Sequence, residues 1–215
     1  MKSNYNNYFK DHYQSTFDEK WIMEYKDWFY SQYNFIESKI KFIGKILEIG
    51  SGLGRFYNLL PEEQKKNYIG LELDEDAASF ANSYFKTNIF LNESLEEFKS
   101  TQLFDRIYAF EVLEHLDNPL LGIEKIYTLL NDYGVFVGTS PYPYIKSLQD
   151  STHMFVLHPE NWKKLFLKSG FKRVEIIPMS FIPFLWRINK NLNIRLPFYI
   201  PFKNVVSTCL IVAKK

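Results

Sequence analysis

A short apolar stretch at 45–49 runs directly into a glycine-rich turn. The turn has three glycines at alternate positions, and they are Gly50, Gly52 and Gly54. Phe56, Leu59 and Leu60 then recur at helical spacing before Pro61. This order predicts a buried strand, a tight turn and a helix. Glycine permits positive φ and, having no Cβ, lets a ligand approach the main chain. Because the first amides of the helix would face that ligand, the pattern predicts a nucleotide-like cofactor at the end of the first strand.

Length and composition exclude several classes of protein. The chain has 215 residues, which suits one domain with a single core. Its net charge of +1 argues against a general nucleic-acid-binding protein, which would carry a basic excess. One cysteine, Cys209, cannot form an intramolecular disulfide and fits a reducing compartment. The polar N-terminal residues do not resemble a secretory signal, and no apolar run reaches the length of about 18 residues of a membrane helix. We therefore expect a cytoplasmic protein.

Short apolar runs alternate with helical segments along most of the chain. The predicted strands are 45–49, 68–73, 88–91, 104–110, 133–139, 171–177 and 205–212. The predicted helices are 54–65, 75–85, 119–131 and 159–169. Such alternation is typical of an α/β fold with a largely parallel sheet. Aromatic residues at three- and four-residue spacing within 1–42 predict one or two amphipathic helices, which would form a cap beside a main domain at 43–215.

The glycine spacing distinguishes between cofactors. A dinucleotide-binding turn has the pattern Gly-x-Gly-x-x-Gly, whereas Arg55 stands where its third glycine would be. This argues against a NAD-dependent oxidoreductase, which remains the alternative from another class. The segment 68–74 is a second strand that ends in an acid about twenty residues after the turn, where a carboxylate can accept hydrogen bonds from ribose hydroxyls. The third strand ends near Glu93, and either Glu93 or the next backbone amides could contact the edge of an adenine.

These segments resemble the class I S-adenosylmethionine-dependent methyltransferases. Residues 47–54 resemble the first motif of that family, and Glu72 falls on its ribose-binding acid. Residues 104–115 resemble its fourth motif, in the subgroup that includes the ubiquinone-biosynthesis O-methyltransferases. Residues 133–141 resemble the fifth strand, and 169–171 the turn before the sixth. The resemblance implies a Rossmann-like sheet of seven mostly parallel strands, flanked by helices, with the last strand antiparallel.

The resemblance also implies which residues bind S-adenosylmethionine. The three glycines, with Ser51, would contact the methionine moiety and the sugar, and Glu48 would help to hold the amino-acid end. Glu72, next to Leu73, would bind the ribose. The residues expected around the adenine are Glu93, Ser94 and Leu95. Those expected beside the methyl donor are Glu111 and Val112. The family usually has aspartate where this chain has Glu93.

A hydroxyl acceptor needs a base to remove its proton. We predict His153, in a polar loop after the fifth strand, and then His115 as catalytic residues. His158 directly precedes Pro159, which is more typical of a helix start. Glu111, Glu114 and His115 also resemble the metal site of small-RNA 2′-O-methyltransferases and of some ubiquinone-pathway enzymes. Because the same pattern occurs in methyltransferases for which no metal is invoked, we predict no bound metal.

The acceptor is the least constrained part of the prediction. The fourth strand is followed by Phe110-Glu111-Val112 and not by the Asn-Pro-Pro-Tyr of amino-group methyltransferases, which favours an oxygen or carbon acceptor. We expect O-methylation of a small-molecule or glycan-type acceptor. Residues 179–204 combine aromatic and apolar side chains with cations. They predict a cap inserted over the site or, alternatively, a peripheral membrane contact through 181–202 that would suit a quinone or lipid-like acceptor.

Overall fold

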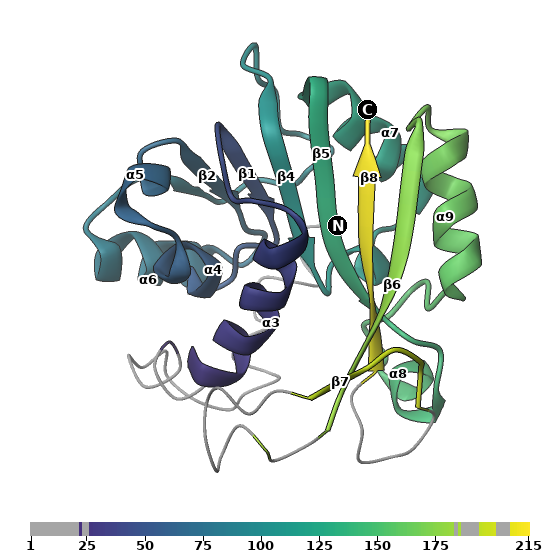
Figure 1. Ribbon diagram of the computed structural model, residues 1–215. Coiled ribbons are helices and arrows are strands. Elements are labelled where there is room, and N and C mark those ends of the chain that lie inside the picture. Colours follow the sequence, from purple (N-terminus) through teal and green to yellow (C-terminus); the bar gives the residue numbers. More distant parts are fainter. Residues whose placement is uncertain (1–21, 23–25, 183–184, 186–193, 201–206) are drawn as a thin grey trace. The chain divides into compact units, whose positions relative to one another are not determined.

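The computed structural model describes residues 22, 26–182, 185, 194–200 and 207–215 (Figure 1). Contacts between Cα atoms divide the chain into two compact units, 1–100 and 101–215. Most of the predicted N-terminal cap, 1–21 and 23–25, lies outside the described residues. So do residues 183–184, 186–193 and 201–206, which include much of the predicted inserted cap. No helix in the described part of the chain is both long enough and apolar enough to cross a membrane.

The first unit contains a parallel three-stranded sheet in the order β3-β2-β1. Its strands are β1 (Ile46–Ile49), β2 (Tyr68–Leu71) and β3 (Phe90–Leu91). All four residues of β1 are buried, as expected for a strand covered on both faces. Ile46 pairs with Tyr68, and Gly70 pairs with Phe90, so that the carboxyl ends of the three strands lie at one edge.

The helices of the first unit are α3 (Lys26–Lys39), α4 (Arg55–Leu59), α5 (Glu62–Lys65) and α6 (Glu75–Phe85). α6 has the predicted bounds, and its first turn is capped by the Asp74 carboxylate, which accepts from the Ala77 amide at 3.0 Å. The single helix predicted over 54–65 is wrong. Leu60 is extended, with ψ of 144°, because Pro61 disfavours helical backbone at the residue before it.

Aromatic side chains form much of the core of the first unit. Phe56 of α4 is 1% exposed and packs on Tyr33 of α3 and on Phe42, with ring centroids 5.3 Å and 5.2 Å apart respectively. Tyr57 packs edge-on against Phe90 at the end of β3. The short helix after the glycine turn is therefore anchored by rings on both of its sides.

The second unit contains a five-stranded mixed sheet in the order β4-β5-β8-β6-β7. Its strands are β4 (Phe104–Phe110), β5 (Leu130–Pro141), β6 (Arg173–Phe181), β7 (Arg195–Leu196) and β8 (Ser207–Lys214). β4 and β5 are parallel, and β8 runs antiparallel to both β5 and β6. The Rossmann-like α/β fold with an antiparallel last strand is thereby confirmed.

The described residues contain eight strands, three in the first unit and five in the second, so the predicted count of seven is wrong. The additional strand is β7, which pairs antiparallel with Ser180 and Phe181 at the end of β6. It lies inside the segment at 179–204, where sequence patterns predicted only a cap. The Arg195 guanidinium donates to the Pro178 carbonyl at 2.7 Å and ties β7 to β6.

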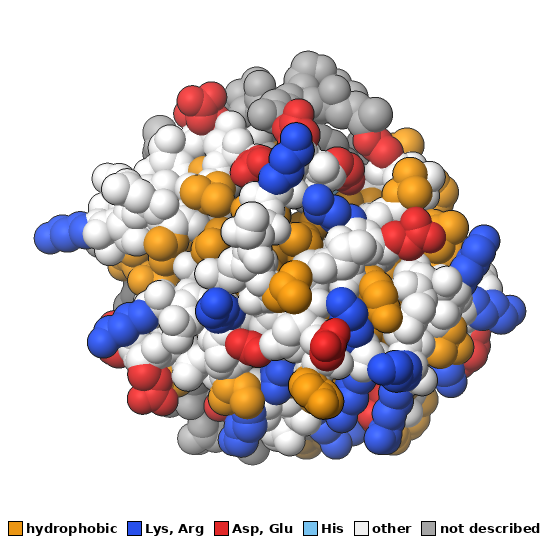
Figure 2. Space-filling view, turned by 90° about the horizontal axis from the view of Figure 1, so that it is seen from above, with side chains coloured by type: hydrophobic (Ala, Val, Ile, Leu, Met, Phe, Trp, Pro, Cys, Tyr) orange, Lys and Arg blue, Asp and Glu red, His pale blue; other side chains and the backbone are white. Residues whose placement is uncertain are grey.

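The helices of the second unit are α7 (Pro119–Leu129), α8 (Ile145–Gln149) and α9 (Pro159–Lys168), with a 3₁₀ turn at Leu113–His115. α7 contacts α9, and α7 packs on β5 while α9 packs on β6, so the two helices cover one face of this sheet (Figure 1). Trp162 and Phe166 of α9 are fully buried there. α8 was not predicted. In Figure 2, acidic and basic side chains are interspersed on the face shown, in keeping with the small net charge.

Candidate functional site

The glycine turn after β1 has the backbone that its sequence predicts. Gly50, Gly52 and Gly54 have φ of 69°, 52° and 77°, in the left-handed region that favours glycine. The buried Ser51 donates its amide to the Leu71 carbonyl of β2 at 2.9 Å, and its carbonyl accepts from the Gly54 amide at 3.0 Å. At Gly54, a Cβ would lie 2.6 Å from the Phe85 ring. Backbone conformation and close packing both require glycine at position 54.

Glu72 lies just after β2 with its carboxylate buried against this turn. One oxygen accepts from the Gly52 amide at 2.6 Å, and the other accepts from the Asp74 amide at 2.9 Å. The side chain has lost nearly all contact with water, which raises its pKa to about 7, and these two amides oppose the shift. The predicted ribose acid therefore sits beside the glycines, as the pattern requires.

Glu48, in the middle of β1, is 3% exposed and accepts a hydrogen bond from the Tyr68 hydroxyl on β2. Burial holds the pKa of Glu48 well above its usual range, and the Tyr68 hydroxyl moderates the shift. Gly70, which pairs with Glu48, makes room for this contact, because a Cβ there would lie 2.9 Å from the Tyr68 hydroxyl oxygen. The sequence did not predict this partner.

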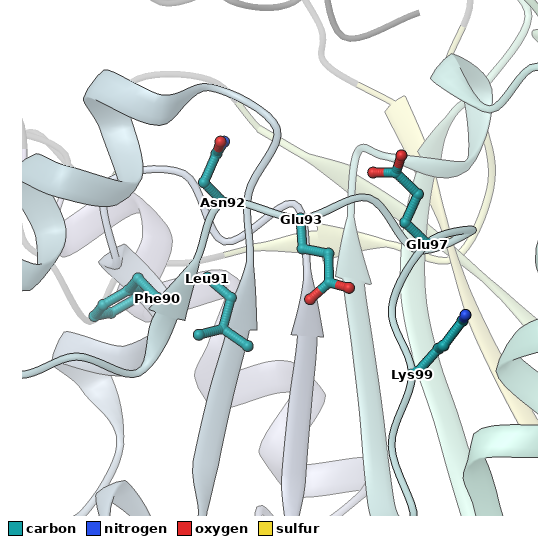
Figure 3. A pocket seen from close by; sticks show the side chains of 6 residues that line it. All are labelled: Phe90, Leu91, Asn92, Glu93, Glu97 and Lys99. Carbon is teal, nitrogen blue, oxygen red and sulfur yellow. The ribbon is translucent and has the colours of Figure 1, made fainter.

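A hollow of about 640 Å³ opens at the end of β3 (Figure 3). The six residues that line it are Phe90, Leu91, Asn92, Glu93, Glu97 and Lys99. Glu93 is thus at the hollow. Ser94 and Leu95 are not among its lining residues: the Ser94 hydroxyl accepts from the Glu97 amide at 3.1 Å, and Leu95 is 3% exposed. Of the three residues predicted to contact the adenine, only Glu93 lines this hollow.

Asn92 fixes the position of the hollow relative to Glu72. Its side-chain amide donates to the Glu72 carbonyl at 3.1 Å and to the Leu73 carbonyl at 2.9 Å. In Figure 3, the Asn92 and Glu93 side chains leave the strand end in opposite directions. Asn92 thus holds the backbone at Glu72 and Leu73, a role that the sequence prediction assigned to no residue.

In the second unit, Glu111 follows β4 with a positive φ of 54°, which is uncommon for a residue other than glycine. Its amide donates to the Thr139 carbonyl at 3.1 Å, and its Oε1 accepts from the Thr208 hydroxyl at 2.8 Å. Thr208 belongs to β8 and lies 97 residues further along the chain. Val112, half-buried, precedes the 3₁₀ turn. No local sequence signal could have identified Thr208.

The two predicted catalytic histidines lie side by side. The ring centroids of His115 and His153 are 4.9 Å apart, with an interplanar angle of 62°. Nδ1 of His115 is 2.8 Å from the Thr152 carbonyl oxygen, and Nδ1 of His153 is 2.7 Å from the Ser147 carbonyl oxygen. A carbonyl oxygen can only accept, so each Nδ1 carries the hydrogen. In the neutral ring, Nε2 therefore bears the lone pair.

Glu114 is 0% exposed and lies next to this pair. The Ser140 side chain lies close enough to act on this carboxylate as a hydrogen-bond donor. Burial holds its pKa well above the usual range, and the charge of Glu111 raises it further. Its backbone carbonyl accepts from the amides of Met154 and Phe155 at 2.8 Å and 2.9 Å, which holds the loop of His153 beside it.

His158 takes no part in this cluster. It is exposed and stands at the start of α9, where its Nδ1 accepts from the Glu160 amide at 3.4 Å. Pro159 occupies the first helical position after it. The structure therefore separates the three loop histidines considered from sequence into a close pair and a helix cap.

The comparisons with known proteins identify the family. A family model described as "Methyltransferase domain" matches residues 28–176. The chain belongs to this methyltransferase family. A search of the curated proteins finds no match.

S-adenosylmethionine-dependent methyltransferases of known structure share the fold. One from Thermotoga maritima is 18% identical over all of both chains, with a TM-score of 0.75. One from Archaeoglobus fulgidus is 22% identical over 92% of this chain and 100% of its own, with a TM-score of 0.67. A third, from Mesorhizobium loti, is 16% identical over 86% and 98%, with a TM-score of 0.61.

S-adenosylmethionine is the cofactor of this methyltransferase, and the residues of the first unit fit it. The Glu72 carboxylate has lone pairs to accept hydroxyl donors, and the glycines, having no side chains of their own, let a ligand approach the main chain. The hollow at the end of β3 offers Leu91 as an apolar wall and Glu93 as a hydrogen-bond acceptor. An adenosine needs this combination of a hydroxyl acceptor, a close main chain and a partly apolar hollow.

Proposed function

We propose that this methyltransferase transfers a methyl group to an oxygen atom of a small-molecule or glycan-type acceptor. The observation that supports an oxygen acceptor is the pair of imidazoles in the second unit. In both His115 and His153 the Nδ1–H group donates to a backbone carbonyl, and Nε2 is the basic nitrogen of the neutral ring. A hydroxyl acceptor must lose a proton, and such a nitrogen can take it.

The cofactor supplies an activated methyl group on a sulfonium, so the protein needs mainly to align the acceptor and exclude water. We assign cofactor binding in the first unit to the glycine turn and the strand ends. The residues are Glu48, Gly50, Ser51, Gly52, Gly54, Glu72, Leu73, Glu93, Ser94 and Leu95. In the second unit we assign it to Glu111 and Val112. The catalytic assignment is to His153 first and to His115 second, and a cytoplasmic location forms part of the same proposal.

A second candidate acceptor is a quinone or another lipid-like molecule at a membrane surface. Its support comes from Ile194 and Phe198, which are 49% and 55% exposed. Both lie within 181–202, the segment for which a peripheral membrane contact is predicted. Exposed apolar side chains next to cations suit an interface with lipid headgroups.

The acceptor atom can be identified with a ¹³C-methyl-labelled cofactor. The full chain is incubated with it and with extract of the cells in which the protein occurs, separated into polar and lipid fractions. We expect a labelled product in the polar fraction whose methyl carbon shows the NMR shift of a methyl ether or ester. Label in the lipid fraction would favour the second candidate, and a methyl carbon bonded to nitrogen or carbon would contradict oxygen methylation.

The His153→Ala variant tests the assigned base. We expect turnover to fall by about 10²- to 10⁴-fold. The affinity for S-adenosylhomocysteine should stay close to the wild-type value, because the residues assigned to ribose and adenine lie elsewhere. His158→Asn is the matched control, since asparagine keeps the helix cap and His158 lies outside the cluster. Undiminished turnover in His153→Ala would remove this histidine from the mechanism.

A further inference from the structure

The register of β1 against β2 places the Tyr68 hydroxyl on the carboxylate of Glu48. Glu48 pairs with Gly70, and Tyr68 lies two residues before Gly70, on the same face of β2. The Tyr68 side chain extends past Gly70, where a Cβ would lie 2.9 Å from its hydroxyl oxygen. That hydroxyl donates to Oε2 of Glu48. The hydrogen bond therefore follows from strand pairing together with a glycine at position 70.

Aromatic packing fixes the position of this donor. Tyr68 is 2% exposed, and its ring packs on those of Phe56, Tyr57 and Phe90, with centroids 6.5 Å, 5.1 Å and 5.7 Å away respectively. Burial raises the pKa of the Tyr68 hydroxyl well above its usual value, and the charge of Glu48 raises it further. The hydroxyl therefore keeps its hydrogen and acts as a donor, from a ring that has little room to turn.

Glu48 is a buried carboxylate with a second acid acting on it. It is 3% exposed, and the neighbouring side-chain charge that acts on it is that of Glu72, which is also negative. A buried carboxylate must be neutralised by a proton or balanced by a cation, and the Tyr68 hydroxyl is a neutral donor. Glu48 stands two residues before Gly50, the first glycine of the turn. The amino-acid end of S-adenosylmethionine carries an α-ammonium group, which is a cation of the kind that this carboxylate needs.

We propose that Tyr68 is a positioning residue for cofactor binding. Its hydroxyl holds the Glu48 carboxylate in the ionised form and in one orientation, so that Glu48 accepts from the α-ammonium group of S-adenosylmethionine. A carboxylate accepts at both oxygens, so one oxygen can accept from the tyrosine while the other accepts from the cofactor. The action of Tyr68 is thus indirect, and it depends on the proposed assignment of Glu48 to the amino-acid end of the cofactor.

Two ligands that differ at the amino-acid end test this role. S-adenosylhomocysteine carries the α-ammonium group, whereas 5′-methylthioadenosine has the same nucleoside and sulfur without the amino acid. The full chain and its variants are titrated with each ligand by calorimetry. In Tyr68→Phe we expect the affinity for S-adenosylhomocysteine to fall by about tenfold or more, because a hydrogen bond to a charged group is lost. The affinity for 5′-methylthioadenosine should stay close to that of the wild type, because this ligand has no ammonium group for Glu48 to bind.

Further variants complete the comparison. Glu48→Gln keeps the shape of the side chain and removes its charge, and it should show the same selective loss. Adding Tyr68→Phe to Glu48→Gln should then weaken binding little further, because the two residues act through one contact. Tyr57→Phe is the matched control, since it removes a hydroxyl from a neighbouring ring of the same aromatic cluster and should bind both ligands like the wild type. Circular dichroism shows whether each variant is folded.

An equal loss for both ligands in Tyr68→Phe would make Tyr68 a structural residue of the whole site and would overturn the proposal. Unchanged affinity for S-adenosylhomocysteine in Tyr68→Phe, together with a loss in Glu48→Gln, also overturns it, while the assignment of Glu48 stands. If Glu48→Gln itself binds S-adenosylhomocysteine like the wild type, the assignment of Glu48 fails and the role of Tyr68 fails with it. None of these results depends on which atom of the acceptor is methylated, so the proposed oxygen methylation is tested separately.

Discussion

Glu72 is the residue through which pH should act on cofactor binding. Its pKa is raised from an ordinary value of 4.5 to about 7 by burial. Ribose hydroxyls donate to the ionised form, so binding of S-adenosylhomocysteine should strengthen as the pH rises through 7. Between pH 8 and pH 6 the ionised fraction falls from about nine-tenths to about one-tenth, and the affinity should fall by about tenfold.

Calorimetry with S-adenosylhomocysteine at the two pH values measures this effect. Glu72→Gln should bind weakly and lose the pH dependence, while the exposed Glu75→Gln should retain both. Equal wild-type affinities at pH 6 and pH 8 would contradict the assignment. Without cofactor, the pH dependence of the free energy of unfolding has the opposite sign to that of cofactor binding. The folded state binds the extra proton, so the contribution of Glu72 to the free energy of unfolding is full below about pH 4.5 and is lost as the pH rises to about 7.

At the residue scale, positions fixed by local backbone were predictable and their partners were not. The glycine turn and Glu72 follow from a pattern within one βαβ unit. Tyr68 as the partner of Glu48 depends on the register of β1 against β2 and on the missing Cβ of Gly70. Thr208 as the partner of Glu111 depends on which strand lies beside β5. Such partners come from tertiary pairing, which single-sequence periodicity does not contain.

Within β5, Gly138 is expected to be intolerant of any side chain. A Cβ at this position would lie 2.7 Å from the Ala109 carbonyl oxygen of β4 and 2.5 Å from the Phe136 ring. Phe136 is fully buried and packs on Phe166 of α9, with centroids 4.9 Å apart, so it has little room to move. Gly138→Ala should lower the free energy of unfolding by about 1–3 kcal/mol, as measured by urea denaturation.

Gly122→Ala in α7 is the matched control. There the added Cβ would lie 2.7 Å from the Cδ1 of Leu116, which is the end of a flexible side chain. Alanine also gains about 1 kcal/mol of helix propensity over glycine, so the two effects should nearly cancel. If Gly122→Ala loses as much stability as Gly138→Ala, then contact of the new Cβ with a rigid backbone does not explain the loss in Gly138→Ala.

At the element scale, predictions held where hydrophobic pattern and end signals agreed. α6, with Asp74 at its start, and β4 have the predicted bounds. The helix at 54–65 breaks at Leu60 because the preference of the residue before Pro61 outweighs apolar spacing. β5 extends beyond the predicted 133–139 because pairing with β8 stabilises residues to Pro141. β7 has two residues and no periodicity from which it could be predicted.

For the whole molecule, cofactor binding should appear as added stability. A ligand that binds only the folded state at a hundred times its Kd raises the free energy of unfolding by about 2.7 kcal/mol. We expect S-adenosylhomocysteine to produce such a gain and NAD to produce none, as measured by denaturation at matched concentrations. Stabilisation by NAD alone would contradict the cofactor assignment. The Glu72→Gln variant should show a reduced gain.

At the same scale, the alternation of strands and helices predicted the fold class correctly, because the order of apolar runs and helical segments is visible in the sequence itself. The number of strands was wrong, because β7 arises from pairing within a segment predicted to be a cap. The histidine pair was only half predictable. Each residue had a reason to be near the site, but their separation of 4.9 Å depends on how the loop before α9 returns to the 3₁₀ turn.

Both imidazoles donate to peptide oxygens, those of Ser147 and Thr152. Every amino acid, proline included, supplies such an oxygen. The side chains at 147 and 152 can therefore change while the backbone carbonyls that the two histidines contact stay in place. Among homologues we expect the two histidines to be retained while positions 147 and 152 vary. A sequence alignment would therefore not reveal the two backbone carbonyls as partners of the histidines.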